Sequence, residues 1–281
     1  MSETRLGGGG VAVRQVLISR PGVAAPQVDR VAVEEPMEVR VNGASFAVIM
    51  RTPGADRDLA AGFLLAEDVI RSADEIGTIE YCQDTTEEGR DNTINVTVTG
   101  GAVDRLTARL GERRQVMMTA SCGMCGRRTI ESLQARVSEV RGQWSVAASM
   151  IASLPDRLRA SQAVFESTGG LHAAGLFSRS GVLEITAEDV GRHNAVDKIA
   201  GRTLLAGRHP LNESILLVSG RTSFELVQKA LLAGIPLIAA VSAPSSLAVE
   251  LAEQSGMTLC GFVRGPQFNV YSHPQRIRTA D

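Results

Sequence analysis

Two cysteines, Cys122 and Cys125, are the side chains of this sequence that are best suited, by type and spacing, to carry out chemistry. A glycine follows each of them and leaves the loop free to adopt backbone shapes that other residues avoid. We expect a helix at about 129–137, so that its first N–H groups and the two arginines before it favour the thiolate over the thiol. Because a thiolate attacks a persulfide or a disulfide, Cys122 is predicted to be a sulfur-carrying nucleophile, and Cys125 could share the sulfur or hand it on.

The cysteine pair has three other interpretations. Half of a zinc site would need two further ligands, for which Cys82, Cys260 and the four histidines are available, although no second CxxC or HxxxH occurs. A thioredoxin-like redox site would follow the first strand of a compact domain, whereas this motif lies in the middle of the chain. A buried pair that only fills space fits poorly with the flanking glycines.

His172 lies in the second segment of interest, 167–175, directly after two glycines and a leucine. A Gly-Gly pair before a strand lets the main chain come close to a ligand or to a neighbouring loop. His172 could then act as an acid, a base or a hydrogen-bond donor. The alternative is a hydrogen-bonded histidine with a structural role.

A third segment, 188–198, gathers charged and polar groups at the predicted start of a helix. His193 and Asp197 are four residues apart and share one helix face, as a base and its orienting carboxylate would. A capped, solvated helix start is the alternative, and it accounts for Asp189 and Lys198. It accounts less well for His193 and its two neighbours.

Two turns that each follow an expected strand form the fourth site. The turn 219–223 offers exposed N–H groups, Arg221 and Ser223, which suit a phosphate or another anion. A similar turn at 242–246 follows the next strand, and two such turns would line one crevice of a parallel sheet. A capped turn without a ligand is the alternative.

The fifth segment, 262–271, follows the last expected strand. Arginine, glycine and aromatic residues there could stack on and clamp a heterocycle that carries phosphates, and a surface loop is the alternative. The residues that we expect to bind a ligand in this segment are Phe262, Val263, Arg264, Gly265, Pro266 and Gln267.

Length and composition restrict the class of protein. A chain of 281 residues with 44% hydrophobic residues is expected to form two packed units without help from disulfides. Its net charge of −2 provides no basic field for nucleic acid or an anionic membrane. The first residues do not resemble a signal peptide, and no apolar run is long enough to span a bilayer. We therefore expect a cytoplasmic protein that binds neither nucleic acid nor a membrane.

The elements that must position these residues divide the chain into three parts. Residues 1–10, with four consecutive glycines, are predicted to be a flexible tail, and 11–112 a small α+β unit with a hairpin at Asn42-Gly43. The part 113–281 ends in an alternating series that predicts parallel strands with helical crossovers. The expected strands are 76–81, 93–98, 115–120, 173–177, 182–186, 215–219, 237–241 and 258–262. The expected helices are 58–69, 129–137, 155–165, 192–205, 223–233 and 245–254.

Five ordered segments together resemble the formate dehydrogenase accessory sulfurtransferase family (FdhD). The matching stretches are 121–126, 167–174, 188–198, 219–225 and 242–246. The resemblance implies a homodimer with a cytidine-deaminase-like α/β sandwich in its C-terminal part. It also implies a carrier that takes persulfide sulfur from a cysteine desulfurase and passes it to the molybdenum cofactor, bis-molybdopterin guanine dinucleotide, before the cofactor enters formate dehydrogenase.

The resemblance also assigns roles to residues. Cys122 matches the persulfide-bearing cysteine of the family, Cys125 its companion, and 262–267 the cofactor-binding stretch. The sequence departs from a true deaminase, because His172 is followed by two alanines and the CxxC precedes it. The zinc ligands and the general acid of a deaminase would then be missing, so we expect no permanently bound metal.

Overall fold

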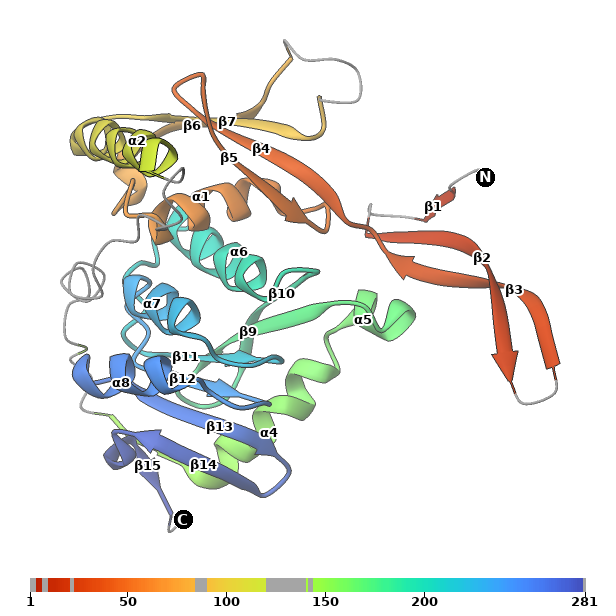
Figure 1. Cartoon of the computed structure of the whole chain (residues 1–281). Coiled ribbons are helices and arrows are strands. Elements are labelled where there is room, and N and C mark those ends of the chain that lie inside the picture. The colour runs from red at the N-terminus through yellow and green to blue at the C-terminus, as the bar shows by residue number, and fades with distance from the viewer. Residues whose placement is uncertain are drawn as a thin grey trace.

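The computed structural model describes residues 4–6, 10–20, 23–83, 90–119, 140 and 144–279. These residues form a mixed α/β structure with several β-sheets, in which helices separate the two larger sheets (Figure 1). Among the described helices, none is both long and apolar enough to cross a membrane.

The largest sheet has six strands in the order β10-β9-β11-β12-β13-β14. Strands β11, β12 and β13 run parallel, as the alternating sequence predicts, whereas β9, β10 and β14 are antiparallel to their neighbours. The strands are β9 (His172–Ser178), β10 (Leu183–Asp189), β11 (Ser214–Val218), β12 (Leu237–Ala240), β13 (Thr258–Arg264) and β14 (Gln267–Ser272).

Helices cover both faces of this sheet, with α6, α7 and α8 on one side and α4 on the other (Figure 1). In β11, Leu216 and Val218 belong to the core beneath α6 and α7, whereas Ile215 and Leu217 belong to the core beneath α4. A strand that is buried on both faces is apolar throughout rather than alternating. The run from Ile215 to Val218 in β11 has this apolar pattern. The helices are α4 (Ala148–Arg159), α5 (Ala163–Thr168), α6 (Arg192–Leu205), α7 (Phe224–Leu232) and α8 (Ser246–Gln254).

The N-terminal part supplies a second sheet of four strands, in the order β5-β4-β7-β6. Asn42 and Gly43 both have positive φ angles of 50° and 81°, which the predicted two-residue hairpin requires. The elements are β4 (Glu35–Val41), β5 (Ala44–Arg51), α1 (Asp56–Ala66), the 3₁₀ turn η1 (Ala73–Glu75), β6 (Ile76–Tyr81), β7 (Thr93–Val98) and α2 (Gly101–Thr119). One continuous core joins this sheet, α1 and the helices α6, α7 and α8.

A third sheet projects from the body (Figure 1). It consists of β1 (Thr4–Leu6), β2 (Val11–Arg20) and β3 (Val23–Ala32), which are antiparallel. Strand β1 thus lies within 1–10, where the sequence predicts a flexible tail. Near the C-terminus, β8 (Val146–Ala147) pairs with β15 (Ile277–Arg278), which follows the 3₁₀ turn η4 (Pro274–Arg276).

Three expectations about the elements are wrong. The strand expected at 115–120 is instead helical as far as Thr119, because most residues from Glu112 to Met118 are good helix formers and continue α2. The single helix expected at 155–165 is two helices, and Pro155 lies inside α4, where Ile151, Leu154 and Leu158 form one buried face. The expected last strand, at 258–262, is followed by β14, so 262–267 forms a β-hairpin rather than a loop beyond the sheet.

The expected division at residue 112 stays a prediction. That position falls inside α2, and the continuous core crosses it. The expected helix at 129–137 lies outside the described residues.

Candidate functional site

A pocket of about 830 Å³ opens beside the ends of β9, β11 and β13. It brings together three of the segments that the sequence singles out: His172 with the two glycines before it, Ser219 at the end of β11, and Val263 to Gly265 in the C-terminal hairpin. Its opposite wall comes from α4 and α5. The antiparallel pairing of β11 with β9 is what places Ser219 beside the start of β9, and Ser219 Oγ accepts the N–H of Ala173 at 2.9 Å.

Positive charge surrounds His172. Burial, together with the charges of Arg192 and Arg221, holds the pKa of His172 below its usual range. A Cβ added at Gly220 would lie 3.3 Å from His172 Nδ1 and 3.7 Å from Arg192 Cδ, so both side chains lie against the backbone there. Arg192 Nε is buried and has no hydrogen-bond partner among the described residues. This arrangement favours a neutral imidazole at His172, and the positive charge of Arg192 and Arg221 beside it favours an anionic ligand.

The two strand-to-helix turns lie side by side, as the sequence predicts. Thr222 donates its N–H to the carbonyl of Ala243 at 3.1 Å, and its own carbonyl accepts the N–H of Ser245 at 2.9 Å. Ser223 precedes α7, and its hydroxyl lies 3.2 Å from His193 Nε2. Arg221 and Ser223 are not among the residues that line the pocket.

The C-terminal hairpin is fastened to the second turn. Phe262 has a positive φ of 54°, and its N–H donates to the carbonyl of Ser242 at 3.2 Å. Arg264 donates from Nε to the carbonyl of Val241 at 3.0 Å, which holds the guanidinium beside the pocket. Pro266 and Gln267 are exposed at the tip of the hairpin.

The polar segment 188–198 joins the N-terminal sheet to the pocket side of the molecule. Asp189 is fully buried, and its Oδ2 lies 2.7 Å from Lys198 Nζ. Asp189 also accepts hydrogen bonds from the N–H of Thr52 and from Asn194 Nδ2, while Asn194 reaches the carbonyl of Met50. The alternative interpretation, in which Asp189 and Lys198 belong to a solvated helix start, is therefore wrong, because tertiary packing buries both side chains.

The predicted pairing of His193 with Asp197 is also wrong. Both carboxylate oxygens of Asp197 lie 2.7 Å from Lys229 Nζ, whereas His193 Nε2 lies 3.2 Å from Glu225 Oε2. Burial raises the pKa of Asp197 to about 6, and Lys229 opposes this shift. The spacing of four residues places the His193 and Asp197 side chains on neighbouring turns of α6. Each of them pairs instead with a residue of α7.

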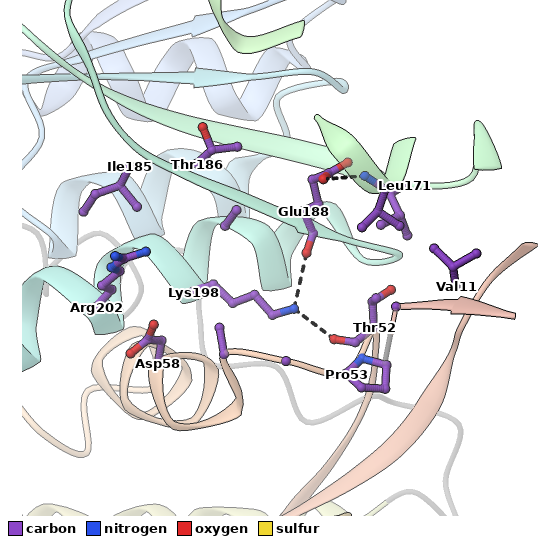
Figure 2. Close-up of a pocket in the computed structure, with 15 residues that line it drawn as sticks. Val11, Thr52, Pro53, Asp58, Leu171, Ile185, Thr186, Glu188, Lys198 and Arg202 are labelled. Atoms are coloured by element: carbon purple, nitrogen blue, oxygen red, sulfur yellow. Dashed lines mark hydrogen bonds between the residues drawn. The ribbon is translucent and has the colours of Figure 1, made fainter. Parts of the chain in front are cut away.

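A smaller pocket of about 310 Å³ lies at the seam between α1, α6 and β10 (Figure 2). Lys198, which lines it together with Arg202, already donates to the carbonyls of Thr52 and Glu188, at 2.9 and 3.3 Å. The Glu188 carboxylate accepts the N–H groups of Val164 and Phe165 at the start of α5. Because internal bonds already engage Lys198 and Glu188, these two residues hold the parts of the chain together, and the larger pocket is the better candidate site.

The remaining cysteines bear on the zinc interpretation. Cys122 and Cys125 lie outside the described residues. Cys260 is fully buried in β13, and burial raises the pKa of its thiol to about 12, so it is a poor metal ligand. Within the described ranges, no group of three or more His, Cys, Asp or Glu side chains is arranged to hold a metal ion.

The wall formed by α4 and α5 is not among the segments that the sequence singles out. Asp156, Arg159 and Phe165 line the large pocket there. Arg159 Cζ lies 4.4 Å from the centroid of the Phe165 ring. Asp156 and Arg159 are three residues apart on the polar face of α4, which by itself predicts only a solvated surface.

The fold and site describe a mixed α/β protein with a large, partly basic pocket at the strand ends of its main sheet. Residues 32–278 match the sequence profile of the FdhD/NarQ family. The chain is 48% identical over 272 residues to the sulfur carrier protein FdhD of Streptomyces avermitilis, with 94% of each chain covered. It is 46% identical to the protein of the same name from Sulfolobus acidocaldarius, with 94% of this chain and 98% of the relative covered.

A crystal structure from Desulfotalea psychrophila, of a protein provisionally described as a formate dehydrogenase accessory protein, is also similar. Its TM-score is 0.76 at 28% identity, and the match covers 96% of this chain and all of that one. The chain therefore belongs to the FdhD/NarQ family.

Proposed function

We propose that the protein is a sulfurtransferase that carries persulfide sulfur on Cys122 from a cysteine desulfurase to the molybdenum cofactor. The cofactor, bis-molybdopterin guanine dinucleotide, is here a bound substrate that later enters formate dehydrogenase. The single observation that best supports a bound cofactor is the 830 Å³ pocket, because three segments far apart in the sequence converge on it. Its volume is within the range of small-molecule and cofactor sites.

The first step is an exchange that needs no oxidant. The Cys122 thiolate attacks the outer sulfur of the desulfurase persulfide, a new S–S bond forms, and the desulfurase cysteine leaves as a thiolate. Cys122 then carries the sulfur as Cys–S–SH.

The second step delivers the sulfur to molybdenum. The thiolate of Cys125 attacks the inner sulfur of the persulfide and expels hydrosulfide, which becomes a ligand of the metal. The two electrons that this sulfur gains come from the two cysteines, which are left as a disulfide. A cellular thiol reductant then restores the pair.

The cofactor would be held mainly by 262–267, with Arg264 directed at its phosphates. Arg221 and Ser223 would extend the site beyond Gly220, since the adjacent turns expose N–H groups at the start of α7. Helices on both faces of the six-stranded sheet also support a cytidine-deaminase-like fold for the C-terminal part. A homodimer remains part of the proposal.

Mass spectrometry tests the carrier role directly. After incubation with a cysteine desulfurase and cysteine, the Cys122 peptide should gain ~32 Da under non-reducing conditions and lose it with a thiol reductant. The variant Cys82→Ala is the matched control and should gain the same mass. An unmodified Cys122, or full sulfur transfer by Cys122→Ala, would contradict the proposal.

A second candidate is a chaperone that shelters the cofactor and docks onto formate dehydrogenase without sulfur chemistry. The pocket favours it as much as it favours a carrier, because the pocket alone explains only binding. Cys122→Ser and Cys125→Ser separate the two: a chaperone would still activate formate dehydrogenase, whereas a carrier would not.

A further inference from the structure

The smaller pocket, at the seam between α1, α6 and β10, is lined by four charged side chains, and internal bonds engage two of them. Lys198 directs its ammonium group at two backbone carbonyls and at the carboxylate of Asp189, so all three of its donors are in use. The carboxylate of Glu188 accepts two N–H groups at the start of α5. These bonds leave Arg202 and Asp58 as the charged groups of the pocket that are available to a ligand.

Arg202 and Asp58 come together where α6 and α1 are closest. Gly201 lies against the carbonyl oxygen of Asp58, which brings both side chains to the same end of the pocket (Figure 2). Burial raises the pKa of the Asp58 carboxyl, and the charge of Arg202 is the strongest of the influences that lower it. Among the described residues, neither side chain forms a hydrogen bond or an ion pair. A cation and an anion thus lie near each other without being paired.

The remaining walls of the pocket are mostly apolar. Figure 2 shows Leu171 and Val11 at the end away from Arg202 and Asp58. The volume of about 310 Å³ is at the lower end of the range for small-molecule sites. The large apolar side chains that line the pocket are those of Val11, Pro53, Val164, Leu171 and Ile185.

The ligand that suits these walls carries both charges and an apolar group. An α-amino acid has a carboxylate and an ammonium group on one carbon atom. Its carboxylate matches the fork of the Arg202 guanidinium, and its ammonium group can donate to the Asp58 carboxylate. A simple anion would leave Asp58 without a partner, and a simple amine would leave Arg202 without one. The apolar walls then favour an apolar side chain on the same molecule.

We propose that this pocket binds a free α-amino acid with an apolar side chain, whose carboxylate pairs with Arg202 and whose ammonium group pairs with Asp58. The site is separate from the large pocket, and the inference does not depend on the proposed function. Val11 and Asp58 belong to the N-terminal part of the chain, whereas Ile185 and Arg202 belong to the main sheet and its helix. The ligand therefore bridges the two parts, and its binding stabilises the folded protein.

Calorimetric titration of the full-length wild type with L-leucine and its analogues tests the inference. Isocaproate is leucine without the ammonium group and isoamylamine is leucine without the carboxylate, so each should bind about tenfold or more weakly than L-leucine. Glycine keeps both charges and lacks the side chain, and it should also bind about tenfold or more weakly. L-leucine should raise the Tm of the protein in proportion to the logarithm of its concentration above Kd.

Two substitutions assign the charges. Arg202→Gln should weaken L-leucine by about 10- to 100-fold and leave isoamylamine nearly unchanged, because isoamylamine has no carboxylate to lose a partner. Asp58→Asn should weaken L-leucine to a similar degree without weakening isocaproate. Arg57→Gln is the matched control, since Arg57 is exposed next to Asp58 and does not line the pocket, and it should keep the affinity within about twofold.

The wild type alone can overturn the inference, so no variant needs to fold for the test. Absence of L-leucine binding, or equal binding of L-leucine, isocaproate and isoamylamine, would each contradict it. An unchanged affinity in Arg202→Gln, with a native circular dichroism spectrum, would do so as well. The gain of mass on Cys122 tests sulfur transfer independently of all these results.

Discussion

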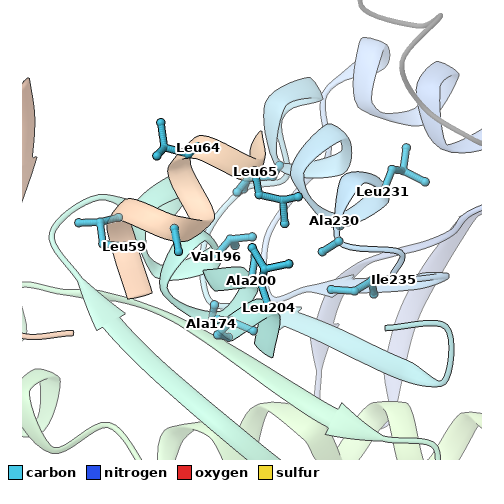
Figure 3. Packing of buried hydrophobic residues seen from close by; sticks show 14 of the residues in the cluster. Leu59, Leu64, Leu65, Ala174, Val196, Ala200, Leu204, Ala230, Leu231 and Ile235 are labelled. Carbon is cyan, nitrogen blue, oxygen red and sulfur yellow. The ribbon is translucent and has the colours of Figure 1, made fainter. Parts of the chain in front are cut away.

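Gly62 of α1 and Gly201 of α6 bring the backbones of their helices into direct contact. A Cβ added at Gly62 would lie 1.9 Å from the carbonyl oxygen of Asp197, and one added at Gly201 would lie 1.8 Å from that of Asp58. Leu59 and Leu64 of α1 pack around this contact, with Val196 of α6 facing them (Figure 3). The N-terminal part is thereby fixed to the helix that begins beside the pocket.

Replacing Gly201 by alanine should destabilise the protein by about 3 kcal/mol or more, because backbone atoms on the facing helix cannot move aside as a flexible side chain can. Urea unfolding measures this change. Gly111→Ala in α2 is the matched control, since a Cβ there meets no atom of the described residues within 4 Å, and it should stabilise by about 0.5–1 kcal/mol. Equal effects of the two substitutions would show that the close contact does not form.

Lys198→Met should cost about 3–5 kcal/mol, because it leaves the Asp189 carboxylate buried without its cation. The side chains of the pair are 5% and 0% exposed, so water cannot replace the lost partner. Unfolding by urea, followed by circular dichroism, gives the difference. Arg179→Gln breaks an exposed pair with Glu213 and should change stability by less than about 1 kcal/mol. A similarly small change in Lys198→Met would contradict the burial of the pair.

The pair of Asp197 and Lys229 should make stability depend on pH. The pKa of Asp197 is raised to about 6 in the folded protein, above its ordinary value in an unfolded chain. The folded protein therefore holds this proton more tightly than the unfolded chain does. The stability contributed by the protonated group is lost as the pH rises through about 6.

Lys229→Met removes the cation that lowers this pKa, so the loss of stability should extend to higher pH. We expect the variant to be about 3 kcal/mol less stable than the wild type at pH 8 and closer to it at pH 5. Urea unfolding at the two pH values measures the difference. In an Asp197→Asn background the pH dependence of the Lys229→Met effect should disappear, and its persistence would assign that dependence to another group.

Arg221→Gln should raise the pKa of His172 toward its ordinary value. Burial is the largest cause of the lowered pKa, followed by Arg192 and then Arg221, so the substitution should recover only part of the shift. Titration of the imidazole Cε1–H signal by NMR measures it. Arg208→Gln, whose partner Glu184 lies on β10, is the control and should leave the titration of His172 unchanged. No change in Arg221→Gln would mean that its guanidinium points away from the pocket.

Much of the local structure follows from the sequence itself. The hairpin at Asn42-Gly43, the helix Arg192–Leu205 and the parallel series β11, β12 and β13 all form where they are predicted. Turn residues, periodicity and apolar runs act over a few positions, so they can be recognised along the chain. The two adjacent turns at 219–223 and 242–246 follow from the parallel series for the same reason.

Only the tertiary structure decides which side chains meet. Helical spacing places His193 and Asp197 on one face, yet their partners Glu225 and Lys229 come from α7. Asp189 accepts a hydrogen bond from Thr52, 137 residues away, and this buries a group that looks solvated along the chain. Asp156 and Arg264 likewise line one pocket only because α4 packs against the sheet. Burial and pairing across such separations depend on how whole elements pack, which no local pattern in the sequence records.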